Sequence, residues 1–295
     1  MLVNKVVVKN YCLLLLIGVI WGSQFGLANI ALKSIAPINI AVTRALIGCL
    51  TLGICSMFLP KNTSNSKGYA TPWKLYILIA FFESVLPLFL LAWGLARVES
   101  GVGAILMGTV PIFTMLIATL VSRQEHLRVQ LVLSVILGFC GIVTLSFPNL
   151  HGGNSSIWGE LAILLSSLSF GISLILMSYL PAGSSIRQMR NILGIAVIPL
   201  LIASLGLNLW SVPSINAVIA VLILGIFCTG IVYLMFMILI RNTTPTFASL
   251  TNYLIPLIGV IIACVFMQEK LFISELVALF LILAALVINQ IKIRN

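Results

Sequence analysis

The sequence is poor in charged residues and contains no aspartate. Lys, Arg, Asp and Glu make up 7% of its 295 residues, whereas an ordinary soluble domain has about 25%. The lack of aspartate excludes aspartyl proteases and the Asp-rich, magnesium-binding prenyltransferases. The histidines, His126 and His151, have no HExxH pattern or ligand-spaced partner, and no Walker A sequence is present. We therefore expect no metal site, no cofactor, no direct use of ATP and no enzymatic activity.

Long apolar runs are the main feature that the sequence does have. Hydrophobic residues form 61% of the chain, in runs of about 20 residues, the length of a helix that crosses a bilayer core. This indicates an all-α, multi-pass protein of the cell inner (cytoplasmic) membrane, in contact with lipid. All cysteines lie in apolar runs and are expected to be small buried hydrophobes. The net charge of +10 is scattered over the links, so no nucleic-acid partner is expected.

Short polar or proline-containing breaks divide the chain into ten predicted transmembrane helices. The first apolar run is long and has no A-x-A-like cleavage site, so we interpret it as a span and not as a signal peptide. The predicted spans are residues 11–32, 37–59, 73–95, 101–122, 129–147, 157–179, 188–209, 213–238, 246–267 and 272–291.

The basic residues predict which side of the membrane each link faces. Cytoplasmic links of membrane proteins carry an excess of Lys and Arg. With the N-terminus inside, the outer links contain Lys33, Arg97 and Lys270, and every other basic residue except Arg44 falls at the inner side. This bias predicts an even number of spans, with both termini in the cytoplasm.

The two halves of the sequence resemble each other. Sliding one half over the other aligns Arg97 with Arg241 and Glu125 with Glu269. Because five spans separate the copies, the second half must enter the membrane from the opposite side, which makes an inverted repeat. Such a repeat is typical of secondary transporters, in which the two halves can exchange conformations. A purely structural duplication is the alternative.

Several short motifs recur in a specific order. They are Trp21-Gly22-Ser23 with Phe25, Pro37 followed by Arg44, Ala96, Pro111, Glu125-His126-Leu127, Gly138 with Gly141, Pro256 and Glu269-Lys270-Leu271. In this order and spacing the chain resembles the EamA family of the drug/metabolite transporter superfamily, over about residues 12–290. It departs from the family pattern at Ile282 to Ala285, where glycines are expected, and at Arg190, which is displaced from the position of a second arginine.

The resemblance implies a fold and an activity. It implies an all-α polytopic membrane protein with ten transmembrane helices in two inverted five-helix EamA repeats, residues 11–147 and 157–291. It also implies a permease that moves small metabolites. Members of the family differ widely in substrate and include exporters of amino acids and related compounds.

Glu83 is a carboxylate near the middle of a predicted span. A helix that starts at Trp73 and rises about 1.5 Å per residue places Glu83 roughly 15 Å deep, close to the bilayer midplane. Charged groups at this depth are costly and often mark a transport pathway. We expect Glu83 to bind a substrate amine or to carry a coupling proton, and a structural carboxylate paired with another helix is the alternative.

Arg44 lies roughly 10 Å below the outer surface in the second span. Its long side chain could snorkel outward or reach Glu83. A role in pinning helices together is favoured for Arg44, and a clamp for a substrate carboxylate is the alternative.

The first span contains Trp21, Gln24 and Asn29. An amide without a partner is costly in hydrocarbon, so Gln24 and Asn29 should face other helices or a cavity. Trp21 lies near the midplane and not in an interfacial belt, where it could form a cavity wall. We expect all three to contact substrate, and helix packing is the alternative for the amides.

Polar residues also precede the prolines of the fourth and ninth spans. Thr109 lies before Pro111, and Asn252 and Tyr253 lie before Pro256. A proline removes an intrahelical hydrogen bond and can leave a carbonyl facing a cavity. We therefore add Thr109, Asn252 and Tyr253 to the candidate substrate-binding residues.

Two other groups are expected to be structural. Glu125 and Glu269 begin the links into the fifth and tenth spans, where a carboxylate favours a helix N-terminus. The sixth span has a face of small polar residues, which favours close helix packing. These residues are Ser166, Ser167, Ser169 and Ser173.

Together these features favour a secondary carrier for a small amphipathic metabolite. An amino acid or a derivative is the leading substrate class, and export is the favoured direction, because a midplane carboxylate beside aromatic and amide groups suits a ligand with an amine and an apolar part. The alternatives are a channel, a scaffold, and a transporter of sugars, nucleotide-type or cationic drug-like compounds. A proton gradient and simple exchange both remain open as the driving force, as does the oligomeric state.

Overall fold

The computed structural model describes residues 2–58, 73–120, 129–150, 156–181, 183–207, 209, 211–242 and 251–290. In chain order its helices are α1 (Leu2–Leu32), α2 (Pro37–Phe58), α3 (Trp73–Ala80), η1 (Phe81–Val85), α4 (Leu86–Leu95), α5 (Ser100–Met107), α6 (Val110–Leu120), α7 (Val129–Leu150), α8 (Ile157–Ser178), α9 (Ser185–Leu207), α10 (Ile215–Gly225), η2 (Ile226–Ile231), α11 (Val232–Asn242), α13 (Thr251–Phe266) and α14 (Ile273–Gln290).

Helices account for every predicted span. Among the described residues, seven continuous helical stretches are long and apolar enough to cross a membrane. Three shorter apolar helices, Val132–Leu145, Leu254–Phe266 and Ile273–Ala285, complete a set of ten. Each of the ten predicted spans therefore has a helical counterpart, with boundaries that differ by a few residues.

The fourth span is broken where the sequence predicts one continuous helix. α5 ends at Met107 and α6 begins at Val110. The break lies just before Pro111, because a proline has no N–H to donate and its ring crowds the preceding turn. Thr109 lies within this break.

The third and eighth spans each contain a π-helical turn at a matching position. η1 lies between α3 and α4, and η2 lies between α10 and α11. Phe81 and Ile226, where the two turns begin, are as far apart in the sequence as Pro111 and Pro256. The two halves thus share a local distortion as well as sequence motifs. π turns are rare and occur frequently at functional sites.

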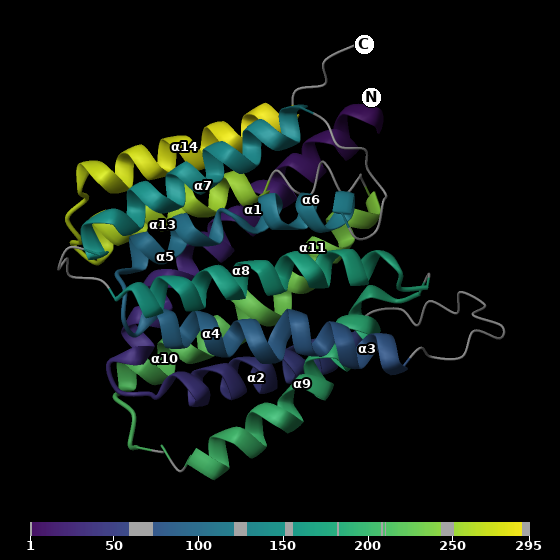
Figure 1. Cartoon of the computed structure of the whole chain (residues 1–295). Helices are drawn as coiled ribbons and strands as arrows, with labels where there is room; N and C mark the ends of the chain where they lie inside the picture. The colour runs from purple at the N-terminus through teal and green to yellow at the C-terminus, as the bar shows by residue number, and fades with distance from the viewer. Residues whose placement is uncertain are drawn as a thin grey trace.

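Equivalent helices of the two halves pack against one another. α2 packs on α9, α5 on α13, and α7 on α14. Figure 1 shows α7 and α14 side by side along one edge of the bundle. α1 packs on α10 and α13, and its counterpart α8 packs on α4 and α6. This exchange of equivalent contacts is the arrangement expected of two five-helix repeats, one of which is inverted.

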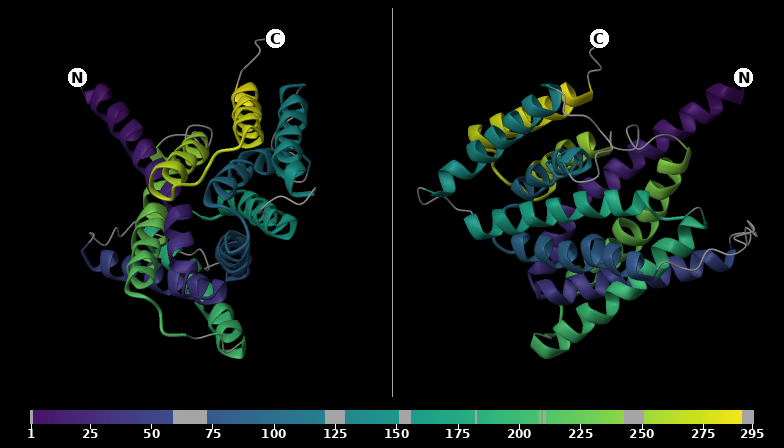
Figure 2. Two further views of the ribbon diagram at one scale, coloured as in Figure 1. Left: turned by 90° about the vertical axis from the view of Figure 1, so that its left-hand side faces the viewer. Right: turned by 45° about the vertical axis from the view of Figure 1, so that its right-hand side comes forward.

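Both chain termini lie at the same end of the bundle (Figures 1 and 2). We call this the termini end, and we call the opposite end, which includes the links 33–36, 96–99 and 268–272, the far end. Two termini at one end agree with an even number of spans. That the termini end faces the cytoplasm remains a prediction from the basic residues.

The links of the far end contact one another across the two halves. The Ser34 and Ser214 hydroxyls lie 3.2 Å apart, and the backbone N–H of Ser156 donates to the carbonyl oxygen of Arg97 at 3.1 Å. The Asn39 amide donates to the carbonyl oxygen of Leu209 at 3.0 Å. These contacts place the predicted outer links together on one side.

Helices approach each other closely through small residues in the half of the bundle near the far end. A Cβ added at Gly259 of α13 would lie 2.4 Å from the Cβ of Ala104 in α5. A Cβ added at Gly94 of α4 would lie 2.8 Å from the carbonyl oxygen of Gly159 in α8. Small residues allow such backbone contact between membrane helices.

Candidate functional site

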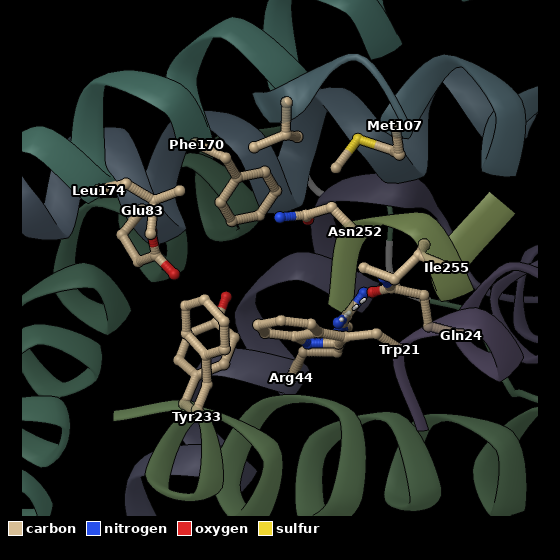
Figure 3. A pocket seen from close by; sticks show the side chains of 12 residues that line it. Trp21, Gln24, Arg44, Glu83, Met107, Phe170, Leu174, Tyr233, Asn252 and Ile255 are labelled. Carbon is tan, nitrogen blue, oxygen red and sulfur yellow. Dashed lines mark hydrogen bonds between the residues drawn. The ribbon is translucent and has the colours of Figure 1, made fainter. Parts of the chain in front are cut away.

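A cavity with about 600 Å³ of empty volume, its opening included, lies among helices of both halves (Figure 3). Most of its wall is apolar or aromatic, and a few polar groups project into it, which is the usual composition of a small-molecule site. The lining residues are Trp21, Gln24, Arg44, Glu83, Met107, Val110, Phe170, Leu174, Tyr233, Phe236, Asn252 and Ile255.

The cavity lies on the side of the midplane nearer the termini end. Gln24 and Glu83 lie near the middle of their spans, whereas Tyr233 and Asn252 lie in the parts of α11 and α13 closer to the termini end. Toward the far end, Phe25 and neighbouring side chains of the core are completely buried. The structure is therefore packed at the far end and hollow on the other side.

Glu83 projects from η1 into this cavity. It is 7% exposed, and the hydroxyl of Ser173 in α8 donates a hydrogen bond to its carboxylate. Figure 3 shows the Tyr233 hydroxyl pointing toward the same carboxylate from the opposite wall. Two hydroxyl groups, those of Ser173 and Tyr233, thus orient the Glu83 side chain.

The π turn that carries Glu83 has a local cause and a tertiary support. Pro87 has no N–H to donate to the carbonyl of Glu83 four residues earlier, so the helix departs from α geometry here. Two serines of α8 bond to this distorted segment. Ser169 donates to the carbonyl oxygen of Phe82 at 2.7 Å, and Ser166 donates to that of Pro87 at 3.1 Å. Ser166 and Ser169 thus join α8 to the third span, whereas Ser173 of the same face bonds to Glu83.

Arg44 joins three helices at another wall of the cavity. It is 3% exposed; its Nη2 donates to Oε1 of Gln24 in α1 at 3.0 Å, and its Nε donates to Oγ1 of Thr229 in η2 at 3.2 Å. These are the contacts that a helix-pinning role requires. The π turns of both halves therefore border the site, η1 through Glu83 and η2 through Thr229.

Glu83 and Arg44 line one cavity without pairing. Within the part of the chain that the structure describes, neither side chain forms an ion pair. Figure 3 shows them at separate walls, with Tyr233 and Trp21 between them. The option in which Arg44 reaches Glu83 is therefore not observed. An acidic and a basic side chain thus lie at separate walls of one cavity, with aromatic rings between them.

Trp21 forms part of an aromatic wall. Its ring centre lies 4.9 Å from that of Phe236 and 6.2 Å from that of Tyr233, with the latter pair close to edge-on. Such tilted and edge-on pairs are favourable aromatic geometries. The wall offers an apolar surface beside the Glu83 carboxylate.

Three of the eight candidates are not placed in the cavity. Asn29 of α1 lies nearer the far end and does not line it. Thr109 also does not line it, because its hydroxyl lies 2.9 Å from that of Ser167 and donates to the carbonyl oxygen of Leu106 at 2.7 Å. A carbonyl at the break before the proline is thus satisfied within the protein. The side chain of Tyr253 lies outside the described residues. The five that line the cavity are Trp21, Gln24, Arg44, Glu83 and Asn252.

Glu269 caps a different helix from the one expected. Its carboxylate accepts hydrogen bonds from the backbone N–H of Ser100 at 3.0 Å, from the Ser100 hydroxyl and from the backbone N–H of Gly101 at 2.9 Å. It therefore caps α5, whose first N–H groups have no helical partner. Glu275 instead binds at the start of α14, accepting from the N–H of Phe272 at 3.0 Å. Glu125 lies outside the described residues.

Sequence reasoning missed most of the apolar lining. Phe170, Leu174 and Phe236 resemble residues that face lipid, so nothing in the sequence marks them. Tyr233 carried one signal, because a phenol hydroxyl inside an apolar span needs a partner when it is buried.

Known proteins resemble this chain in sequence over most of its length. The EamA-like transporter family matches residues 8–147 and 157–290. The uncharacterized inner membrane transporter YedA of Escherichia coli is 29% identical over 283 residues, covering 92% of this chain and 87% of YedA. The uncharacterized transporter YvbV of Bacillus subtilis is 26% identical over 292 residues, covering 96% of this chain and 92% of YvbV.

A solved crystal structure shares the fold. It superposes with a TM-score of 0.64 at 15% identity and covers 96% of both chains. At this identity the likeness concerns the fold alone. The matched domains and the helical structure confirm the prediction of ten transmembrane helices in two EamA repeats.

Proposed function

Because the chain belongs to the EamA-like transporter family, it is a multi-pass membrane transporter and not an enzyme, and we propose that it carries a small amphipathic metabolite by alternating access. The proposed substrate class is an amino acid or a derivative. One observation carries this proposal: Glu83 is a buried carboxylate that lines the central cavity without a cationic partner among the described residues.

The walls of the cavity support a ligand with several kinds of groups. An amine of the ligand would supply a cationic partner for Glu83. Its charge-assisted hydrogen bonds would be stronger than neutral ones. Trp21 and Tyr233 would contact the apolar part and, through their ring faces, the amine. Arg44 and Gln24 lie at the other wall, where a carboxylate of the ligand would be attracted.

A cationic, drug-like solute is the second candidate. Arg44 already donates to Gln24 and Thr229, which supports a structural role for its charge. In that case Glu83 would be the main charged group that selects the solute.

The position of the cavity supports export as the direction. It extends toward the termini end, which the basic residues predict to be cytoplasmic. A substrate would then bind from the cytoplasm. We further propose that Glu83 takes up a proton when the substrate amine leaves, which would couple export to a proton gradient.

Counterflow in reconstituted vesicles tests the proposal. The probes are leucine, lysine, glutamate and glucose, and the variants are Glu83→Gln and the control Glu99→Gln, a carboxylate outside the cavity. Loss of a charge-assisted contact corresponds to about tenfold or more, so Glu83→Gln should reduce amino-acid counterflow by this factor while melting normally. Glu99→Gln should transport normally. Full counterflow with unchanged pH dependence in Glu83→Gln would remove Glu83 from the mechanism, and flux without saturation would indicate a channel.

A further inference from the structure

A second cavity, with about 270 Å³ of empty volume, its opening included, adjoins the first. The two cavities share one wall, to which both halves of the chain contribute. The residues that line both are Trp21, Glu83, Leu174, Tyr233 and Phe236. A ligand held at Glu83 would therefore border both spaces.

Three methionines form the remaining wall of the second cavity. Met177 comes from α8, Met189 from α9 and Met237 from α11. Met189 and Met237 are 2% and 7% exposed, so both are enclosed by protein and do not face lipid. The polar groups of this space all belong to the shared wall. Its chemistry is thus apolar everywhere except near Glu83.

We propose that the second cavity binds the apolar part of the substrate, and that Met177, Met189 and Met237 determine which apolar groups are accepted. This inference rests on the proposed role of Glu83 in holding an amine. The amine would lie at the shared wall, and the chain or ring beyond it would extend among the three methionines.

Methionine gives this subsite a particular selectivity. Its side chain is unbranched, has three rotatable bonds and contacts aromatic rings favourably through sulfur. A wall of three such side chains can repack around linear, branched or aromatic groups of similar volume. The subsite should therefore select by volume and not by shape.

The same space also lies toward the termini end, since Met177 is near the end of α8 and Met189 near the start of α9. If this space were instead a passage by which substrates enter or leave, substitutions in it would change the transport rates of all substrates alike. A subsite would instead change the ranking of substrates by the size of their apolar group. The two readings therefore predict different outcomes.

The experiment uses linear alkylamines from ethylamine to octylamine, and measures binding to the purified full chain by thermal stabilisation. The wild type should bind longer amines more tightly, because each buried CH₂ favours binding. Met189→Phe and Met237→Phe would fill the cavity, so the longest amines should bind about tenfold more weakly while ethylamine is unchanged. Two variants are used because both positions are buried, where a larger side chain can prevent folding. Melting without ligand reports whether each variant folds.

Two controls sharpen this experiment. Met189→Leu conserves volume and should keep the wild-type ranking. Met235→Phe changes a partly buried methionine of α11 that lines neither cavity, and it should also keep the ranking.

The outcomes separate this inference from the proposed function. A ranking that is unchanged in both phenylalanine variants, or no dependence on chain length in the wild type, would overturn the subsite. A uniform loss for every amine, ethylamine included, would place the effect at the amine and not at the apolar group, and it would also overturn the subsite. If the chain-length effect is found but leucine and lysine are not transported, the subsite stands and the amino-acid proposal fails.

Discussion

The two ends of the helix bundle are built differently. Near the far end, helices from opposite halves touch through small residues such as Gly259 and Ala104, and the links bond to one another. Toward the termini end, the same helices separate around two adjoining cavities. A repeated sequence has thus formed a closed end and a hollow end in one conformation.

The difference indicates which contacts would change in the proposed alternating access. In an inverted repeat, the opposite conformation would have the far end open and the termini end closed. The contacts between α5 and α13, and the bonds from Glu269 to the start of α5, hold the far end together in the present conformation. In the proposed alternating access, these contacts would have to break and form again in each cycle.

The largest effect is expected where backbones touch at the far end. In Gly259→Ala, the new Cβ would lie 2.4 Å from the Cβ of Ala104, an atom that cannot rotate away. α5 and α13 would have to separate, and overpacking of this kind costs about 1–3 kcal/mol, or roughly 5 °C in melting temperature. The measurement is thermal melting of the purified protein.

The matched control for this change is Gly206→Ala. A Cβ added at Gly206 has no neighbour within 4 Å among the described residues, so the melting temperature should not fall. Equal melting of the two variants would contradict the claim that the far end is closed by backbone contact.

A smaller effect is expected from Glu269→Ala. The change removes the carboxylate that caps α5, and loss of such a cap costs about 0.5–2 kcal/mol. The open population of the far end should rise by up to about thirtyfold. A cysteine introduced at Val102, which is 3% exposed, should then react faster with a membrane-impermeant maleimide.

The control for the cap is Glu275→Ala. Glu275 bonds to Phe272 within its own helix start, so its loss should not increase labelling at position 102. If both alanine variants label alike, Glu269 does not hold the two halves together at the far end.

The closed and hollow ends also show what the sequence could predict of the fold. Apolar runs and basic links are sufficient to find the helices, because lipid requires every span to satisfy its own backbone groups. The break before Pro111 does not follow from the proline alone, because Pro256 and Pro199 lie inside the continuous helices α13 and α9. The π turns could not be predicted either, since η1 depends on Pro87 together with Ser166 and Ser169 of a distant helix. Nor could the sequence tell which helix Glu269 caps.

The sequence could predict the polar residues of the candidate site but not the apolar ones. Glu83, Arg44 and Gln24 could be selected because polar groups are costly in hydrocarbon and must face protein or water. Thr109 is also polar, but its hydroxyl bonds to Leu106 and Ser167 outside the cavity. Apolar lining residues such as Phe236 are indistinguishable in sequence from lipid-facing ones, so the second cavity could be found only in three dimensions.

The smallest predicted effect concerns charge at the far end. Burial raises the pKa of the Glu99 carboxyl above its ordinary value, and the nearby charge of Glu269 raises it further. An ionised Glu99 is therefore unfavourable in the folded protein, and this cost appears as the pH rises above the pKa of the unfolded chain. Glu99→Gln should raise the melting temperature near neutral pH by about 1 °C, the size expected for a partly exposed charge.

The pH dependence separates charge from packing in this variant. At about pH 3 the carboxyl is largely protonated in both the folded and unfolded states, so the gain from Glu99→Gln should vanish. In a double variant that also carries Glu269→Gln, the gain in melting temperature from Glu99→Gln at neutral pH should be smaller, because the neighbouring charge is then absent. A gain of equal size at both pH values would instead assign the effect of Glu99→Gln to packing and not to the charge of Glu99.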